Sequence, residues 1–193
     1  MSRITNRQTE KASDKSFRMM LAIFKIVDSF FPYVRKRMKK FGVENGMTVV
    51  DYGCGPGRYS VPIAEMVGAK GRVYAVDIHE MALKNVQDRI RKEGIKNIKT
   101  SLAKGHDDGD YNSGLKDNTA DIVCAIDMFF IIKKPTEFLK EIRRILKPNG
   151  ILIIDDGHQS RKVTKQKLDS SGIFTIIEET KDHLKCKIAQ EQM

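Results

Sequence analysis

The spacing of hydrophobic positions predicts two helices near the start of the chain. Between residues 17 and 31, apolar side chains recur at steps of three and four, which places them on one helix face. A second, shorter helix is expected over residues 33–41, and Gly42 ends it. Residues 1–15 show no periodicity, so we expect a flexible tail there and a helical lid over residues 16–41.

From residue 47 onwards, short apolar runs alternate with stretches of helical spacing. This alternation is typical of an α/β fold with a Rossmann-like, doubly wound and mostly parallel sheet. The last two apolar runs flank a short polar turn, which predicts an antiparallel C-terminal hairpin. We therefore expect one domain, with its core over residues 42–193 and a strand at or within each of residues 47–52, 72–77, 95–102, 121–126, 151–155, 172–179 and 183–189. Helices are expected at residues 57–67, 80–92, 135–146 and 162–170.

The first of these strands leads into a loop that is rich in glycine. From Asp51 the chain reads DYGCGPGR, with Gly53, Gly55 and Gly57 at alternate positions. Glycine leaves room where a ligand must approach the backbone, and a strand, a glycine loop and a helix form a nucleotide-type site. The dinucleotide fingerprint needs a further glycine where this chain has Arg58, so the spacing disfavours a dehydrogenase that uses NAD.

The acids on either side of this loop identify the pattern more closely. Asp51 precedes the loop, Asp77 ends the second strand, and the sequence LKPNG follows at residues 146–150. Together with the loop, these features resemble the class I methyltransferases that use S-adenosylmethionine, over about residues 42–190. The broader similarity is to small-molecule methyltransferases of the ubiquinone and menaquinone biosynthesis type. The resemblance implies S-adenosylmethionine as cofactor and S-adenosylhomocysteine as product.

The resemblance also implies which residues bind the cofactor, beginning with the three glycines. Asp51 is expected to orient the glycine loop and to help neutralise the ammonium group of the ligand. Asp77 is expected to accept hydrogen bonds from the ribose hydroxyls, and Ile78 to pack against the adenine. Family members commonly bind the adenine amino group with an acid after the third strand. Here Asp107 or Asp108 is the candidate, and a solvated acidic loop is the alternative.

Residues after the fourth and fifth strands are expected to face the transferred methyl group and the acceptor. Asp127 is the candidate to accept a proton from the acceptor or to hydrogen-bond the bound molecules. His158 is a second candidate for a catalytic contact, and helix capping is the alternative for both. Phe129 and Phe130 either line an apolar pocket or belong to the core. We expect no metal site, because the acids near His158 have no specific ligand spacing.

Charge and composition bear on partners and location. The net charge is +10, and residues 1–48 carry 11 Lys and Arg against 4 Asp and Glu. This basic N-terminal third is either a solvated face or a surface for nucleic acid. No apolar run approaches the roughly 20 residues of a membrane span, and the polar start is unlike a secretory signal. We therefore expect a cytoplasmic protein without stable membrane insertion, and three reduced cysteines. The oligomeric state is not predicted.

The resemblance implies in-line attack of an acceptor on the sulfonium methyl group. Alignment and desolvation then supply most of the rate, so no strong acid–base constellation is required. We expect a small-molecule acceptor. One alternative is a nucleic-acid acceptor, suggested by the basic N-terminal third. Another is a non-catalytic protein that binds S-adenosylmethionine, suggested by the unusual polar loop over residues 103–118. The helix over residues 17–31 either covers these ligands or lies on a membrane surface.

Overall fold

A computed structural model describes residue 19, residues 33–104, residue 109 and residues 111–190. The expected tail, the first helix apart from Met19, and the two candidate adenine-binding acids lie outside these described residues. The strands are β1 Thr48–Tyr52, β2 Arg72–Asp77, β3 Ile98–Leu102, β4 Ala120–Ala125, β5 Leu146–Ile154, β6 Phe174–Glu179 and β7 Leu184–Ile188. The helices are α2 Tyr33–Phe41, α3 Ser60–Val67, α4 Glu80–Glu93, the 3-10 helix η1 Phe129–Ile131, α5 Pro135–Ile145 and α6 Arg161–Asp169.

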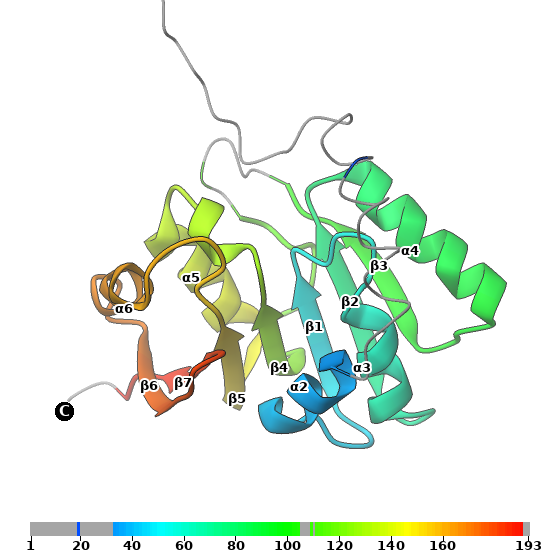
Figure 1. The fold of residues 1–193 in the computed structure, drawn as a ribbon, viewed down its shortest axis with the longest axis horizontal. Helices are drawn as coiled ribbons and strands as arrows, with labels where there is room; N and C mark the ends of the chain where they lie inside the picture. Colours follow the sequence, from blue (N-terminus) through cyan, green and yellow to red (C-terminus); the bar gives the residue numbers. More distant parts are fainter. Residues whose placement is uncertain (1–18, 20–32, 105–108, 110, 191–193) are drawn as a thin grey trace, which may run out of the picture.

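All seven strands form one sheet in the order β3-β2-β1-β4-β5-β7-β6 (Figure 1). Strands β1 to β5 pair in parallel, whereas β7 runs antiparallel to both β5 and β6. The doubly wound sheet and its antiparallel hairpin are therefore confirmed. The strand order reverses between β1 and β4, and ligands of such sheets bind beyond the carboxyl ends of the strands at this point.

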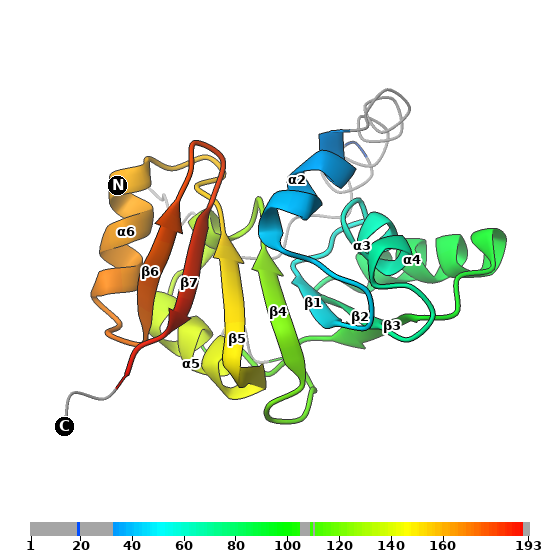
Figure 2. The same cartoon turned by 90° about the horizontal axis from the view of Figure 1, so that it is seen from below.

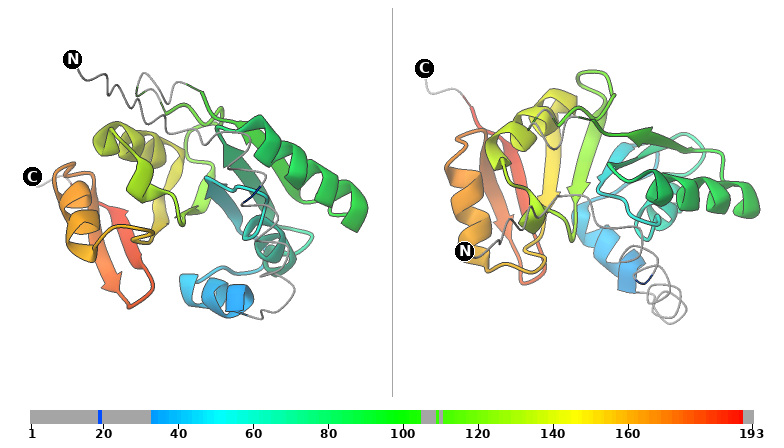
Figure 3. Two further views of the ribbon diagram at one scale, coloured as in Figure 1. Left: turned by 45° about the horizontal axis from the view of Figure 1, so that its top comes forward. Right: turned by 90° about the horizontal axis from the view of Figure 1, so that it is seen from above.

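Helices cover both faces of the sheet because successive strand residues point to opposite sides (Figure 3). In β1, Val49 belongs to the core cluster that includes residues of α2, α3 and α4, and its neighbour Val50 belongs to the cluster that includes residues of α5 and α6. Figure 2 shows α2 at the carboxyl end of the central strands, on the same side as the turn between β6 and β7. The N-terminal helix α2 therefore lies at the edge where a ligand is expected.

Two expected boundaries differ from the structure. Helix α3 begins at Ser60 and not at residue 57, because Gly57 has φ +81°, which lies outside the helical region. Strand β5 begins at Leu146, five residues before the expected start. Leu146 is fully buried and pairs with Ala120, and the ladder shifts register before it resumes at Ile151. The residues between them form this irregular start of the strand.

Two further expectations, on membrane spans and on the cysteines, can be compared with the structure. Among the helices that the structure describes, none has both the length and the apolar character that a membrane crossing requires. Cys54, Cys124 and Cys186 are buried free thiols, as predicted.

Candidate functional site

The glycine loop after β1 is held against the end of β2. The backbone N–H groups of Gly53 and Cys54 both donate to the Val76 carbonyl, at 2.8 and 3.0 Å. A Cβ at Gly53 would lie 2.8 Å from Met128 Cγ, so packing alone requires glycine there. Among the residues that the structure describes, a Cβ at Gly55 would meet nothing within 4 Å, although Gly55 has φ +51°. The loop therefore leaves open space at Gly55, where a ligand can approach the backbone.

Asp77, at the end of β2, is aimed at this loop. Its Oδ2 accepts the Gly55 N–H at 2.8 Å, and its Oδ1 accepts the His79 N–H at 2.9 Å. Burial raises the pKa of Asp77, and backbone hydrogen bonds, first those of Gly55 and His79, act against that rise. A carboxylate has about four lone-pair positions, so each oxygen can still accept one hydroxyl proton. Ile78 follows and is half-buried against the core.

Asp51 lies in β1, just before the glycine loop, and its side chain is buried. This side chain holds the start of α3. Its Oδ2 accepts the Ser60 hydroxyl at 2.5 Å. Burial raises the pKa of Asp51 to about 7, and the Ser60 hydrogen bond opposes this shift. A buried acid poised between its two charge states can respond to a cation that arrives nearby.

Asp51→Asn is expected to stabilise the ligand-free protein in a pH-dependent manner. The pKa of Asp51 rises from 3.8 in the unfolded chain to about 7 in the fold, so its contribution to stability is full below pH 3.8 and is lost as the pH rises through 7. The asparagine variant avoids this loss. Its advantage in the free energy of unfolding should therefore grow between pH 4 and pH 8, by up to about 4 kcal/mol.

Urea unfolding of both proteins at these two pH values measures the advantage. Ser171→Ala, which changes a hydroxyl remote from Asp51, serves as the control and should show no such growth. An advantage for Asp51→Asn that is equal at both pH values would contradict the shifted pKa.

A second cluster surrounds Asp127, beyond the ends of β4 and β5. Asp127 has φ +55°, which is uncommon outside glycine, and its N–H donates to Asp155 Oδ1 at 2.8 Å. The Asp127 carboxylate is exposed, and Tyr59 Oη lies 3.5 Å from its Oδ2. Burial raises the pKa of Tyr59 to about 12, so its phenol keeps the proton that it can donate. Burial, followed by the charge of Asp127, raises the pKa of Asp155.

Arg37 completes this cluster from α2 and was missed by sequence reasoning. Its guanidinium is 8% exposed and donates to Tyr59 Oη and Asp155 Oδ2, each at 2.8 Å. The solvated basic face expected for α2 is therefore wrong at Arg37. The helical spacing carried a signal, because Arg37 lies on the same face as the buried Val34 and Phe41.

The other residues expected at this edge take separate positions. His158 is exposed, and its ring meets Phe130 edge to face with centroids 4.9 Å apart. Phe129 is fully buried and belongs to the core, whereas Phe130 is half-buried. Asp156 accepts from Thr164 Oγ1 at 2.7 Å, and Ser160 is the residue that caps α6. Within the ranges that the structure describes, no three His, Cys, Asp or Glu side chains gather as a metal site would require.

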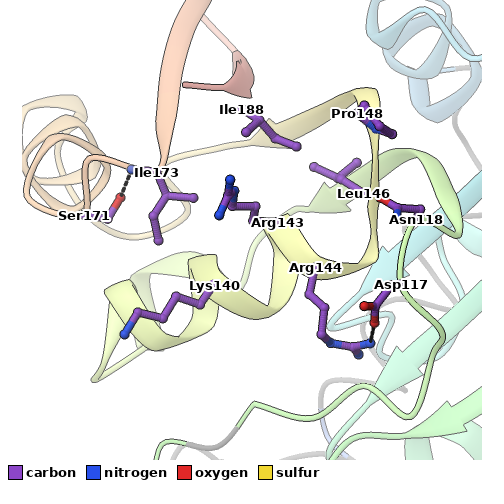
Figure 4. Close-up of a pocket in the computed structure, with 10 residues that line it drawn as sticks. All are labelled: Asp117, Asn118, Lys140, Arg143, Arg144, Leu146, Pro148, Ser171, Ile173 and Ile188. Carbon is purple, nitrogen blue, oxygen red and sulfur yellow. Dashed lines mark hydrogen bonds and ion pairs between the residues drawn. The ribbon is translucent and has the colours of Figure 1, made fainter. Parts of the chain in front are cut away.

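A groove of about 660 Å³ lies at the opposite edge of the sheet (Figure 4). Its walls come from the amino ends of β4 and β5, from α5 and from the segments next to β6 and β7. The groove is thus separated from the glycine loop by the length of the strands. It is lined by Asp117, Asn118, Lys140, Arg143, Arg144, Leu146, Pro148, Ser171, Ile173 and Ile188.

Comparison with known proteins gives a consistent result. The family model described as "Methyltransferase domain" matches residues 43–191. A demethylmenaquinone methyltransferase from Lactococcus lactis is 29% identical over 141 residues, which are 68% of this chain and 50% of that protein. A protein-L-isoaspartate O-methyltransferase from Methanococcoides burtonii is 27% identical over 69% of this chain and 60% of its own. The chain thus spans about half the length of the curated relatives it matches.

Solved structures show the same fold. A methyltransferase from Aquifex aeolicus that depends on S-adenosylmethionine superposes with a TM-score of 0.76 at 24% identity, over 93% of this chain and 100% of that one. An arsenic(III) S-adenosylmethionine methyltransferase from Chlamydomonas reinhardtii has a TM-score of 0.57 at 18% identity, over 75% of this chain and 62% of that one.

Proposed function

Because this chain belongs to the methyltransferase domain family and has the fold of methyltransferases that depend on S-adenosylmethionine, we propose that it transfers a methyl group from S-adenosylmethionine to a small-molecule acceptor. The glycine loop carries this proposal. It is open at Gly55 and tied to Asp77, whose carboxylate keeps lone pairs for the two ribose hydroxyls. Gly53 and Gly57 shape the loop, and Ile78, which follows Asp77 and is half-buried, contacts the adenine.

When bound, S-adenosylmethionine supplies a methyl group on a positively charged sulfur. The loop and Asp77 hold the donor, and residues after β4 and β5 align the acceptor. The acceptor atom forms its bond to the methyl carbon as the carbon–sulfur bond breaks, and the electron pair of that bond stays on sulfur. The acceptor proton passes to the exposed carboxylate of Asp127, and His158 contacts the acceptor from the neighbouring loop. Alignment by these residues supplies most of the rate.

Charge and burial narrow the kind of acceptor. Among the described residues, no cation lies within ion-pair distance of the Asp127 carboxylate. The nearby guanidinium of Arg37 pairs with Asp155. A carboxylate acceptor would meet a like charge there. The half-buried Phe130 and the buried Met128 add apolar surface. An uncharged molecule with a hydroxyl or amine proton and an apolar body fits this surface better than an acidic residue such as the isoaspartate in the name of one relative.

The basic segment of α2 gives little support to a nucleic-acid acceptor. Arg37 is buried, Arg35 pairs with Glu65, and Lys40 lies 3.5 Å from Asp182. Binding of the protein to RNA or DNA at low salt would revive this alternative, since phosphate contacts weaken steeply with salt. Cofactor binding without transfer to any acceptor in a cell extract would favour the non-catalytic alternative.

Asp127→Asn is expected to lower the turnover of S-adenosylmethionine about 100-fold, with its dissociation constant changed less than about threefold. The amide keeps the size of the side chain but cannot take the proton of the acceptor. Transfer of labelled methyl to an extract of small molecules first identifies the acceptor. Kinetics with that acceptor then measure the effect. Asp117→Asn at the opposite edge is the matched control. Full turnover by the Asp127 variant would remove the proposed role.

A further inference from the structure

Arg37 joins segments that are far apart in the sequence. It reaches from α2 to Tyr59 at the start of α3, to Asp155 after β5 and, through a 3.0 Å hydrogen bond, to the carbonyl of Asp182 in the turn between β6 and β7. Phe41 packs on the same turn, with its ring 4.8 Å from that of His183. The helix α2 is thus fixed at the carboxyl edge of the sheet through one buried guanidinium.

Two of the partners of Arg37, Asp155 and Tyr59, also contact Asp127. Asp155 uses one oxygen for Arg37 and the other for the Asp127 N–H. Tyr59 accepts from Arg37 and faces the Asp127 carboxylate with its hydroxyl proton. Arg37 is therefore connected to Asp127 in two ways, each through one intervening residue. Asp155 connects it to the Asp127 backbone N–H, and Tyr59 connects it to the Asp127 carboxylate.

The backbone of Asp127 needs such support. A residue other than glycine at φ +55° is strained, and it keeps this conformation only where its surroundings favour it. The hydrogen bond from its N–H to Asp155 provides this support. Asp155 in turn is held as an acceptor by the charge of Arg37, which acts against the rise that burial causes in the pKa of Asp155.

We propose that Arg37 is a positioning residue of the acceptor site, which orients Asp127 through Asp155 and Tyr59. This inference rests on the proposed function. It makes α2 a part of the acceptor site, so that a change in this helix alters methyl transfer without altering the binding of S-adenosylmethionine. Arg37 itself touches no reacting atom.

A purely structural role for Arg37 has different consequences. If Arg37 only anchors α2, its loss exposes the amides of α2 to solvent exchange and lowers the melting temperature, and Asp127 is unaffected. If it positions Asp127, the amide of Asp127 itself loses protection, because its hydrogen bond to Asp155 is no longer fixed. Hydrogen exchange followed by NMR separates the two without any acceptor.

Four variants of the full chain form the experiment. Arg37→Met removes the charge, Arg37→Lys keeps the charge but not the fork that reaches two partners, and Arg35→Met changes the exposed neighbour as a control. The double variant Arg37→Met/Asp155→Asn leaves no buried acid unpaired, so it can fold where the single variant does not. Each is titrated with S-adenosylhomocysteine, subjected to hydrogen exchange and assayed with the acceptor that the labelled-methyl experiment identifies.

We expect Arg37→Met, or the double variant, to bind S-adenosylhomocysteine within about threefold of wild type. Its Asp127 amide should exchange about tenfold faster or more, and its kcat should fall about 10- to 100-fold with an unchanged KM for S-adenosylmethionine. Arg37→Lys should recover part of both losses, and Arg35→Met should match wild type. Faster exchange confined to α2, or an unchanged kcat, would overturn the role of Arg37. A wild-type protein that binds no S-adenosylhomocysteine would instead refute the proposed function.

Discussion

Asp77→Asn should weaken the binding of S-adenosylmethionine about 100-fold or more. In the wild type, both carboxylate oxygens have a lone pair left after they accept the Gly55 and His79 amides. A hydrogen bond to a charged group contributes about 1.5–3 kcal/mol, so two ribose hydroxyls lose at least about 3 kcal/mol when the charge is removed. The asparagine amide also presents donors where acceptors are needed. Isothermal titration calorimetry gives the two dissociation constants.

The matched control for this variant is Asp88→Asn. Asp88 lies on the exposed side of α4 and pairs with Arg91, so the same chemical change there removes no ligand contact. We expect its affinity to stay within about threefold of wild type. Burial raises the pKa of Asp77, so asparagine removes a charge that is costly to bury, and the fold should survive. Wild-type affinity in a folded Asp77→Asn protein would refute the ribose contact.

Gly55→Ala should leave the protein folded but lower its affinity for S-adenosylmethionine about 100-fold. The new methyl group would meet no atom of the described part of the chain within 4 Å, so the cost to the fold is that of a left-handed alanine, about 1–2 kcal/mol. The same methyl group would occupy the space through which the ligand approaches the Gly55 backbone. Thermal unfolding and calorimetry on the same sample measure the two effects separately.

Gly94→Ala is the control for backbone strain alone. Gly94 has φ +66°, its Cβ would also meet nothing within 4 Å, and it ends α4 away from the loop. It should lose similar stability and keep full affinity. Gly53→Ala, in contrast, should destabilise the fold more, because Met128 stands 2.8 Å from the new atom. Equal affinity in Gly55→Ala and Gly94→Ala would show that no ligand approaches the loop at Gly55.

The fold was predictable because its signals are local. Alternate residues such as Val49 and Val50 face opposite sides of the sheet, and the spacing of such residues is visible in the sequence. The glycine loop and Asp77 were likewise predictable, because a strand end, a tight loop and the next strand end follow a fixed order. The start of β5 was not predictable. Leu146 pairs with Ala120, but the next residues are turn-forming types and the register shifts there, so the sequence pattern does not indicate a strand.

The cluster around Asp127 lay beyond sequence reasoning for a different reason. Arg37 and Asp155 are separated by 118 positions, and Arg37 and Tyr59 by 22. The helical spacing places Arg37 on the same face as Val34 and Phe41, but nothing in this run of basic residues indicates that its partner is a buried acid. Only the packing of α2 on the sheet, which buries Val34, Met38 and Phe41, brings the guanidinium to the carboxyl edge. Asp127 and His158 were found from their place after the strands, and their roles stay predictions.

Titration of the wild-type protein with S-adenosylmethionine and S-adenosylhomocysteine tests the central claim most directly. We predict one site for each ligand, with dissociation constants on the order of 1–100 μM, and loss of both in Asp77→Asn. Binding of neither ligand at millimolar concentration to a correctly folded protein would contradict the account, because the glycine loop would then serve only as a tight turn between β1 and α3.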